Sequence, residues 1–120
     1  MDEPLGKVTI APNVLTTIVR QTTLEQPGVK RLTPAPPKMR GWPGPTRAIE
    51  DGIIITVDDE GVHVEVHIAA ENGINLLKLG EALQDSIFRA IEEMLGMNVA
   101  EVNVYIDEVV LSALPSTQDS

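Results

Sequence analysis

Apolar and polar side chains alternate most regularly along residues 62–70. A period of two is typical of a strand that buries one face. The apolar face of this strand holds Val62, Val64, Val66 and Ile68, and the polar face holds His63, Glu65 and His67. A β-branched run at 53–57 precedes it, and the acidic turn between them ends in Gly61, which suits a left-handed turn position. The pattern therefore predicts an antiparallel hairpin.

Two other segments place apolar residues at helical spacing. The first begins at Pro12, whose missing N–H costs nothing at a first helical position, and it ends before Pro27. The second begins after Asn75, a good N-cap, and closes at Gly96. Its predicted apolar stripe consists of Leu76, Leu79, Leu83, Ile87, Ile91 and Met94, widened by Phe88 and Leu95. Gly80 interrupts this helix at a cost of about 1 kcal/mol relative to alanine, and we expect it to let the hairpin approach closely.

Shorter strands are predicted around these elements. Residues 6–10 alternate as a strand, residues 29–33 form a short one with the weakest pattern, and residues 99–110 alternate as the last strand. The order β-α-β-β-β-α-β predicts an α+β fold, with a small antiparallel or mixed sheet and two helices packed on one face. A chain of 120 residues fits a single domain over 1–120.

Residues 33–47 are predicted to form a loop of unusual composition. Five prolines and two glycines lie between Thr33 and Thr46, which excludes regular hydrogen-bonded structure and favours an extended, polyproline-like conformation. A long segment of this kind within a small domain is usually functional or mobile. The polar tail at 112–120 is expected to fray.

Charge is divided unevenly along the chain. The net charge is −9, yet residues 26–49 carry five basic and no acidic side chains, whereas residues 50–120 carry fifteen acidic and two basic ones. The overall charge opposes a phosphate backbone, while the basic segment favours a local contact with an acidic partner, a second copy or an anionic membrane surface. The candidate contact residues are Lys30, Arg31, Lys38, Arg40, Trp42 and Arg47. Trp42 is either an exposed anchor for a partner or a staple for its own loop.

Motifs that carry chemistry are sparse. The chain has no cysteine, which excludes disulfides and thiolate metal sites. It has no nucleophile–base motif and no phosphate loop, so we expect no catalytic residues, no enzyme activity and no cofactor. His63 and His67 would lie about 13 Å apart on a straight strand, too far to bind one ion. We expect the face that they form with Glu65 to be solvated, with pH sensing as the alternative. The acidic turn at 58–60 is likewise expected to be solvated.

Three stretches together resemble the alkaline shock protein family, also called the general or envelope stress response family of Gram-positive-type bacteria. They are GKVTIAPNV at 6–14 ending as QPGV at 26–29, ENGINL at 71–76, and MLGMNVAEVNVYI at 94–106. The resemblance implies a small cytoplasmic α+β protein that accumulates in envelope or alkaline stress, and that in some members reaches the membrane through an integral membrane partner. It implies no reaction. The loop at 33–46 is longer and more basic than the family pattern.

These observations lead to a function hypothesis with two alternatives. The leading hypothesis is a non-enzymatic stress response protein that acts as an interaction or scaffold module, with a protein partner and homo-oligomers formed through exposed strand edges. No apolar stretch reaches the roughly 20 residues of a membrane span and no secretory leader is present, so we expect a cytoplasmic protein that is peripheral at the membrane at most. The alternatives are a nucleic-acid-binding domain, which the net charge disfavours, and a small-ligand or metal-binding protein that uses the His63, Glu65 and His67 face.

Overall fold

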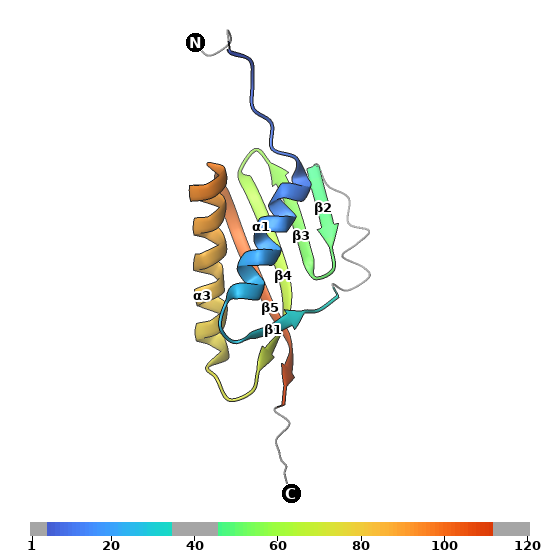
Figure 1. Ribbon diagram of the computed structural model, residues 1–120, viewed down its shortest axis with the longest axis vertical. Helices are drawn as coiled ribbons and strands as arrows, with labels where there is room; N and C mark the ends of the chain where they lie inside the picture. The colour runs from blue at the N-terminus through green and yellow to red at the C-terminus, as the bar shows by residue number, and fades with distance from the viewer. Residues whose placement is uncertain (1–4, 35–45, 112–120) are drawn as a thin grey trace, which may run out of the picture.

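The computed structural model describes residues 5–34 and 46–111, and for residues 46–50 it describes the backbone only. Two helices lie against a curved sheet, and the N-terminal segment extends away from the body (Figure 1). In chain order the elements are α1 (Pro12–Glu25), β1 (Val29–Leu32), β2 (Thr46–Glu50), β3 (Ile53–Asp58), β4 (Gly61–Glu71), α3 (Leu76–Arg89), the π-helical turn η2 (Ala90–Met94) and β5 (Val99–Val110).

The two helices begin and end where the sequence places them. Helix α1 starts at Pro12, and Ala11 before it offers no side-chain cap. Helix α3 starts after Asn75, whose Oδ1 accepts the Lys78 N–H at 3.0 Å. Gly96 follows η2 with a φ of +67°, and a helix C-terminus uses a left-handed residue of this kind. The local signals at these ends were therefore sufficient to predict the helices.

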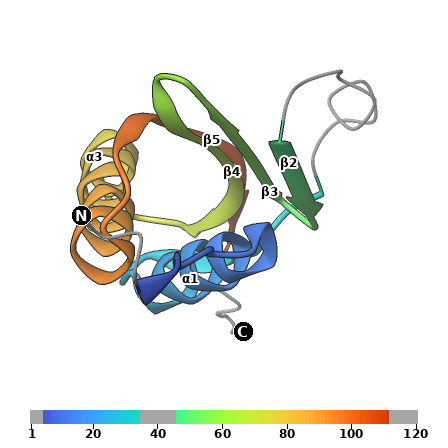
Figure 2. The same cartoon turned by 90° about the horizontal axis from the view of Figure 1, so that it is seen from above.

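The five strands form one mixed sheet built around β4. Strand β3 pairs antiparallel with the first half of β4, and β1 pairs antiparallel with its last residues on the same side. Strand β5 pairs parallel with β4 along the other side, and β2 extends the sheet beyond β3. The sheet curves around α1 and α3, which both lie on its concave side (Figure 2). The predicted α+β fold is confirmed.

The hydrophobic core lies between the helices and the concave face. Its fully buried side chains include Leu15 and Val19 of α1, Leu83 and Ile87 of α3, Ile91 of η2, Ile53 and Ile55 of β3, and Val62, Val64, Val66 and Ile68 of β4. The alternation along β4 therefore buries the predicted apolar face and turns the histidines to the convex face. Burial of one such side chain contributes about 1.5–3 kcal/mol.

The predicted strand order is wrong at two places. Residues 6–10 pair with no described strand, and Thr46–Glu50 forms a strand, β2, that was not predicted. The predicted short strand is present at Val29–Leu32. The predicted loop at 33–47 extends too far, because Thr46–Glu50 forms β2, and Arg47 lies in this strand. Strand β2 pairs with β3 through the tight turn at 51–52. Its short sequence has little alternation, so its partner strand rather than its own pattern makes it a strand.

Parts of the remaining predictions fall outside the described residues. These are the loop residues 35–45, which include Lys38, Arg40 and Trp42, and the tail residues 112–120.

The apolar stripe of α3 is narrower than predicted. Met94 is 66% exposed and Phe88 is also exposed. The π-helical turn places an extra residue in the last turn, which rotates Met94 outward while Ile91 stays buried. The expected close approach at Gly80 is also wrong, because a Cβ built there meets no atom within 4 Å.

The fold generates a matched test of this core. Leu83→Ala should lower the free energy of unfolding by about 2–5 kcal/mol, because the side chain is fully buried between helix and sheet. Leu24→Ala makes the same chemical change at an exposed position of α1 and should stay within about 0.5 kcal/mol. Urea denaturation followed by circular dichroism measures both. Equal losses for the two variants would contradict the assigned core.

Candidate functional site

The convex face of the sheet carries a row of titratable side chains. Alternation along β4 turns His63, Glu65 and His67 to this face, as predicted. The parallel register places residues of β5 beside them: Glu101 opposite His63, Asn103 opposite Glu65, and Tyr105 opposite His67. Two histidines therefore lie on the same face as acidic residues from a neighbouring strand.

His67 is the buried member of this row. Its exposed fraction is 3%. Its Nδ1 lies 2.8 Å from Asp107 Oδ2, and its Nε2 lies 2.8 Å from Glu65 Oε2. The ring also stacks on Tyr105 with centroids 4.7 Å apart. The predicted solvated face is therefore wrong at His67, because the ring is enclosed by partners from its own strand and β5.

The backbone around His67 explains why this position is enclosed. The His67 N–H donates to Gly52 O at 2.8 Å, and the His67 carbonyl accepts the Thr33 N–H at 2.9 Å. Along one edge of β4, His67 thus lies between the segment paired with β3 and the segment paired with β1. A side chain at Gly52 would place its Cβ 2.6 Å from Thr33 O, so this junction requires glycine. Thr33 Oγ1 donates to Asp107 Oδ2 at 3.1 Å and closes the network.

Thr33, Glu65, His67 and Asp107 form a hydrogen-bonded cluster that links neighbouring strands, called the clamp below. Each ring nitrogen lies within hydrogen-bond distance of a carboxylate, so Glu65 and Asp107 hold the ring from two sides. The clamp joins β1, β4 and β5 through Thr33, His67 and Asp107.

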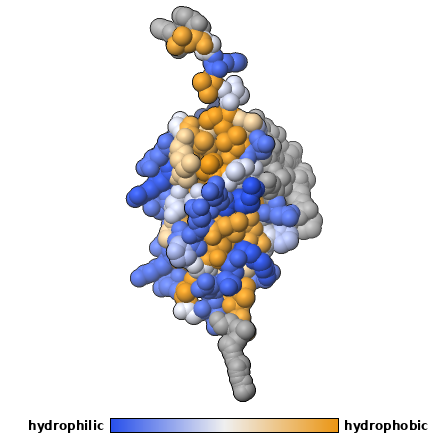
Figure 3. Space-filling view, in the orientation of Figure 1, coloured by the Kyte–Doolittle hydropathy of each residue, from blue (hydrophilic) through white to orange (hydrophobic). Residues whose placement is uncertain are grey.

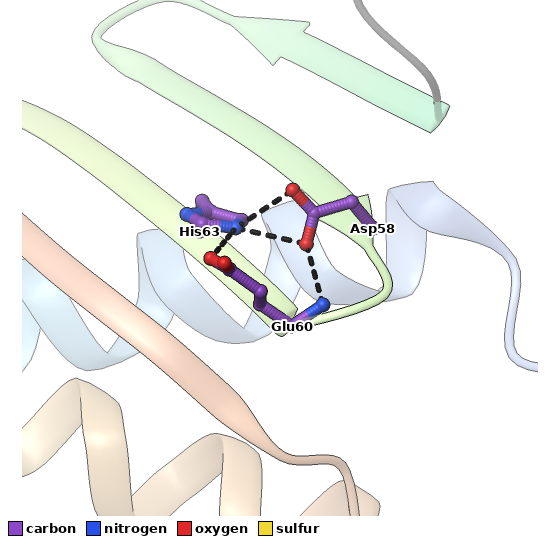
Figure 4. A group of neighbouring side chains, drawn as sticks. All are labelled: Asp58, Glu60 and His63. Atoms are coloured by element: carbon purple, nitrogen blue, oxygen red, sulfur yellow. Dashed lines mark hydrogen bonds and ion pairs between the residues drawn. The ribbon is translucent and has the colours of Figure 1, made fainter.

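His63 makes a second, more exposed cluster at the β3–β4 hairpin (Figure 4). Its Nδ1 lies 2.8 Å from Glu101 Oε2, and its Nε2 lies 3.0 Å from Asp58 Oδ2 and 3.9 Å from Glu60 Oε1. Hydrogen bonding to Glu101, and then to Asp58, raises the pKa of His63 above its usual value, and partial burial opposes the shift. The Glu60 backbone N–H and His63 lower the pKa of Asp58, and His63 lowers the pKa of Glu101.

The same hairpin is where described residues could hold a metal ion. The ligand atoms of Asp58, Glu60 and His63 lie within 4.8 Å of one another. His67 is not part of this group, because its nitrogens face Glu65 and Asp107. Each nitrogen of His63 already has a carboxylate partner, Asp58 in the hairpin and Glu101 in β5, so ion pairing accounts for the cluster.

A second surface feature lies along the outer edge of β5. Strand β5 pairs only with β4 among the described strands, so its other edge is unpaired there. An open groove of about 270 Å³ separates this edge from α3. It is lined by Leu76, Leu77, Gly80, Glu81 and Gln84 of α3 and by Val104 and Ile106 of β5. Gln84 Nε2 donates to the Val102 carbonyl at 3.0 Å, which shows that this edge carbonyl faces the helix. Phe88 lines an adjoining hollow.

The basic candidate residues are only partly placed. Lys30 is exposed on β1, and Arg31 Nη2 lies 2.6 Å from Glu108 Oε1 of β5. Arg47 lies in β2, where only the backbone is described. The structure thus places Lys30 and Arg31 together on one strand and joins Arg31 to an acidic neighbour.

Sequence reasoning missed the partners of the histidines and the groove. The alternation in 99–110 does put Glu101, Asn103 and Tyr105 on one face, but the pairing of β5 with β4 was needed to bring them to the histidines. For the groove, two signals were present: the glycine in the middle of α3, and Phe88 at the border of the stripe.

Comparisons with known proteins agree on one family. A family model described as the alkaline shock protein 23 family, with a cell envelope-related function, matches residues 1–111. The uncharacterized protein YqhY of Bacillus subtilis (strain 168) is 26% identical, over 88% of this chain and 78% of its own length. No solved structure matches the chain. Among residues 5–34 and 46–111, no helix has the length and apolar character that crossing a membrane requires.

The His63 cluster should make stability depend on pH in a defined window. A raised pKa means that the contribution of His63 is complete below its ordinary pKa of 6.5 and is lost as the pH rises through the folded value. The lowered pKa values of Asp58 and Glu101 mean that their contribution is lost in acid, below their ordinary values of 3.8 and 4.5. The difference in unfolding free energy between wild type and His63→Gln should therefore be largest between pH 4.5 and 6.5 and should shrink above it.

Urea denaturation across this range gives the measurement. Glu101→Gln removes the main cause of the His63 shift and should flatten the profile on the alkaline side. Glu93→Gln makes the same change on the exposed surface of η2 and should leave the profile unaltered. A profile for Glu101→Gln that matches wild type would refute the assigned ion pair.

The clamp at His67 should contribute to stability through its bonds. His67→Gln should lower the free energy of unfolding by about 1.5–3 kcal/mol, because the buried ring and its hydrogen-bond contacts with the carboxylates of Glu65 and Asp107 are lost. Tyr105→Phe keeps the stacked ring and should stay within about 0.5 kcal/mol. Denaturant midpoints of the two variants measure the difference. If His67→Gln were as stable as wild type, the ring would not hold the strands together.

Proposed function

We propose that this chain is a non-enzymatic scaffold protein that binds an extended protein segment along the outer edge of β5. The chain belongs to the alkaline shock protein 23 family, which has a cell envelope-related function. The family supplies the cellular setting, and the groove beside β5 supplies the means of binding. An added strand gains main-chain hydrogen bonds from the edge and specificity from pockets for alternate side chains.

One observation carries this proposal: the outer edge of β5, which no described strand pairs with, lies beside an apolar groove. Val104 and Ile106 point from β5 toward α3, and Leu76 and Leu77 face them from the helix. Leu77 is 72% exposed, so its side chain is not used by the core. Natural proteins usually cover or charge such an edge. Here Gln84 satisfies one edge carbonyl, at Val102, and leaves the groove open.

The convex face is less suited to a partner than the groove. Its charged side chains are largely paired with one another, as His63 with Glu101, His67 with Asp107, and Arg31 with Glu108. A partner that replaced these pairs would have to desolvate charges and break hydrogen bonds that are already made. Burial of apolar surface in the groove carries no such penalty.

We also infer that the scaffold works on the cytoplasmic side of the membrane and is brought there by an integral membrane partner. This setting fits the envelope-related family and the lack of a membrane-crossing helix among the described residues. The net charge of −9 favours a protein partner over nucleic acid.

The basic segment supplies a second proposed contact, with an acidic surface of the partner. The candidate residues are Lys30, Arg31, Lys38, Arg40, Trp42 and Arg47. Lys30 supports this proposal because its side chain is exposed and forms no ion pair with a residue of the described ranges. Arg31 is the weaker contributor, since Glu108 already binds its guanidinium.

Photo-crosslinking in the native cell tests the groove. A photoreactive phenylalanine analogue at Leu77 lies in the groove, and the same analogue at Ala82 lies on the exposed face of α3 away from it. We expect adducts to an envelope protein from position 77, few from position 82, and fewer at 77 when Gly80→Leu fills the groove. Equal labelling at both positions, or labelling at 77 that Gly80→Leu does not reduce, would refute the proposed binding edge.

A further inference from the structure

The N-terminal segment 6–10 has the character of a strand without a partner. Lys7, Val8, Thr9 and Ile10 alternate polar and apolar residues, which predicts a strand. In the structure the segment is extended beyond α1, and it makes no backbone hydrogen bond to any described residue. Val8 is 92% exposed and Leu5 is 95% exposed. The hydrophobic surface of this projecting segment is visible in Figure 3. The described part of the chain therefore leaves the side chains of Leu5 and Val8 almost fully exposed to water.

The groove beside β5 has open space at Gly80, which lies in its lining. Gly80 sits in the middle of α3, where glycine is about 1 kcal/mol less favourable than alanine. A Cβ there would meet open space, so packing within this chain gives no reason for the glycine. A strand running along the edge of β5 would pass beneath α3 at this point. The missing side chain leaves room for its backbone and side chains.

The two faces of such a strand would match the two faces of β5. Side chains on alternate positions of an added strand share the faces of its neighbour. Val8 and Ile10 would then join Val104 and Ile106 on the helix side, in the groove. Lys7 would lie on the convex side, where the β5 carboxylates of Glu101, Asp107 and Glu108 are already paired with His63, His67 and Arg31. Pairing in this sense therefore brings the apolar face of the segment against the apolar lining of the groove.

The segment cannot reach the same edge within its own chain. Only Ala11 separates Ile10 from α1, which packs against β1, β2, β3, η2 and α3. Strand β5 is not among these elements, and its outer edge borders the groove along α3. One linking residue spans about 3.5 Å, which is too short to carry Ile10 across the width of α3. If residues 6–10 supply a strand to this groove, that strand therefore comes from another molecule.

We propose that residues 6–10 of one copy add a strand to the outer edge of β5 in a second copy. This inference rests on the proposed function in that it uses the same edge, and it names a second copy of this chain as the occupant. Each copy offers one strand and one groove, so reciprocal exchange gives a closed dimer and one-way exchange gives a longer assembly.

The oligomeric state of the purified full-length protein tests the proposal. Val8→Asn removes an apolar side chain from the strand, and Thr9→Asn makes a similar change on its other face. Gly80→Leu fills the groove, and Ala82→Leu adds the same residue to the exposed face of α3. Leucine has a better helix propensity than glycine, so Gly80→Leu should fold. We expect wild type, Thr9→Asn and Ala82→Leu to associate, and Val8→Asn and Gly80→Leu to raise the dissociation constant at least tenfold. Sedimentation velocity over a dilution series measures this.

A mixing experiment tests the joint itself, meaning the contact between residues 6–10 of one copy and the groove beside β5 of another. Val8→Asn retains an intact groove, and Gly80→Leu retains an intact strand. Each alone should be monomeric, but a mixture should form a one-to-one heterodimer through the one remaining strand–groove pair. Monomeric wild type would overturn the inference, as would an assembly that either variant leaves intact, or a mixture that stays monomeric.

The outcome is separable from that of the proposed function. If the purified chain is monomeric but the photoreactive residue at Leu77 still labels an envelope protein in cells, the binding edge stands and the second copy is wrong. If the chain associates through this joint and labelling yields only a second copy, the inference stands and the edge serves self-assembly alone.

Discussion

The sheet depends on β4, the strand that is hydrogen-bonded along both of its edges for nearly its whole length. Strand β5 takes one edge, while β3 and β1 divide the other between them. Hydrogen bonding along this edge continues without a gap where the two strands meet. His67 provides that continuity, since its N–H bonds Gly52 and its carbonyl bonds Thr33. The path of the chain on either side of the basic segment follows from this single junction.

The side chain of His67 reinforces the junction that its backbone makes. A buried imidazole with two carboxylate partners is stable only when every donor and acceptor is satisfied, because the interior does not solvate an unpaired polar group. Thr33, Asp107 and Glu65 complete the set. The cluster at His63 repeats the pairing near the surface, where water competes with it and the charge state follows pH. The polar side chains on the convex face of the sheet therefore mainly link neighbouring strands.

The charged side chains of the convex face are paired with one another, so the edge of the sheet is better suited to binding another molecule. The last strand cannot pair on its outer side within the described residues, and α3 covers that side incompletely. Exposed edges of this kind are normally blunted against uncontrolled association. A protein of an envelope-related family that leaves one open, beside an apolar groove, has a surface suited to ordered assembly. The glycine in α3 is best understood as part of that surface.

The sequence alone determined the local elements, because each has a strong local signal: Pro12 and Asn75 for the helix starts, Gly61 for the hairpin, and alternation for β4. It also indicated the family, through three spaced stretches. It could not determine β2, the neighbours of the histidines or the free edge of β5, because these depend on which strands pair. Alternation tells which face a side chain takes, and it carries no information about the adjacent strand. Only the tertiary structure therefore decided that His67 is buried between Glu65 and Asp107, and that residues 6–10 pair with no strand in the part of the chain that the structure describes.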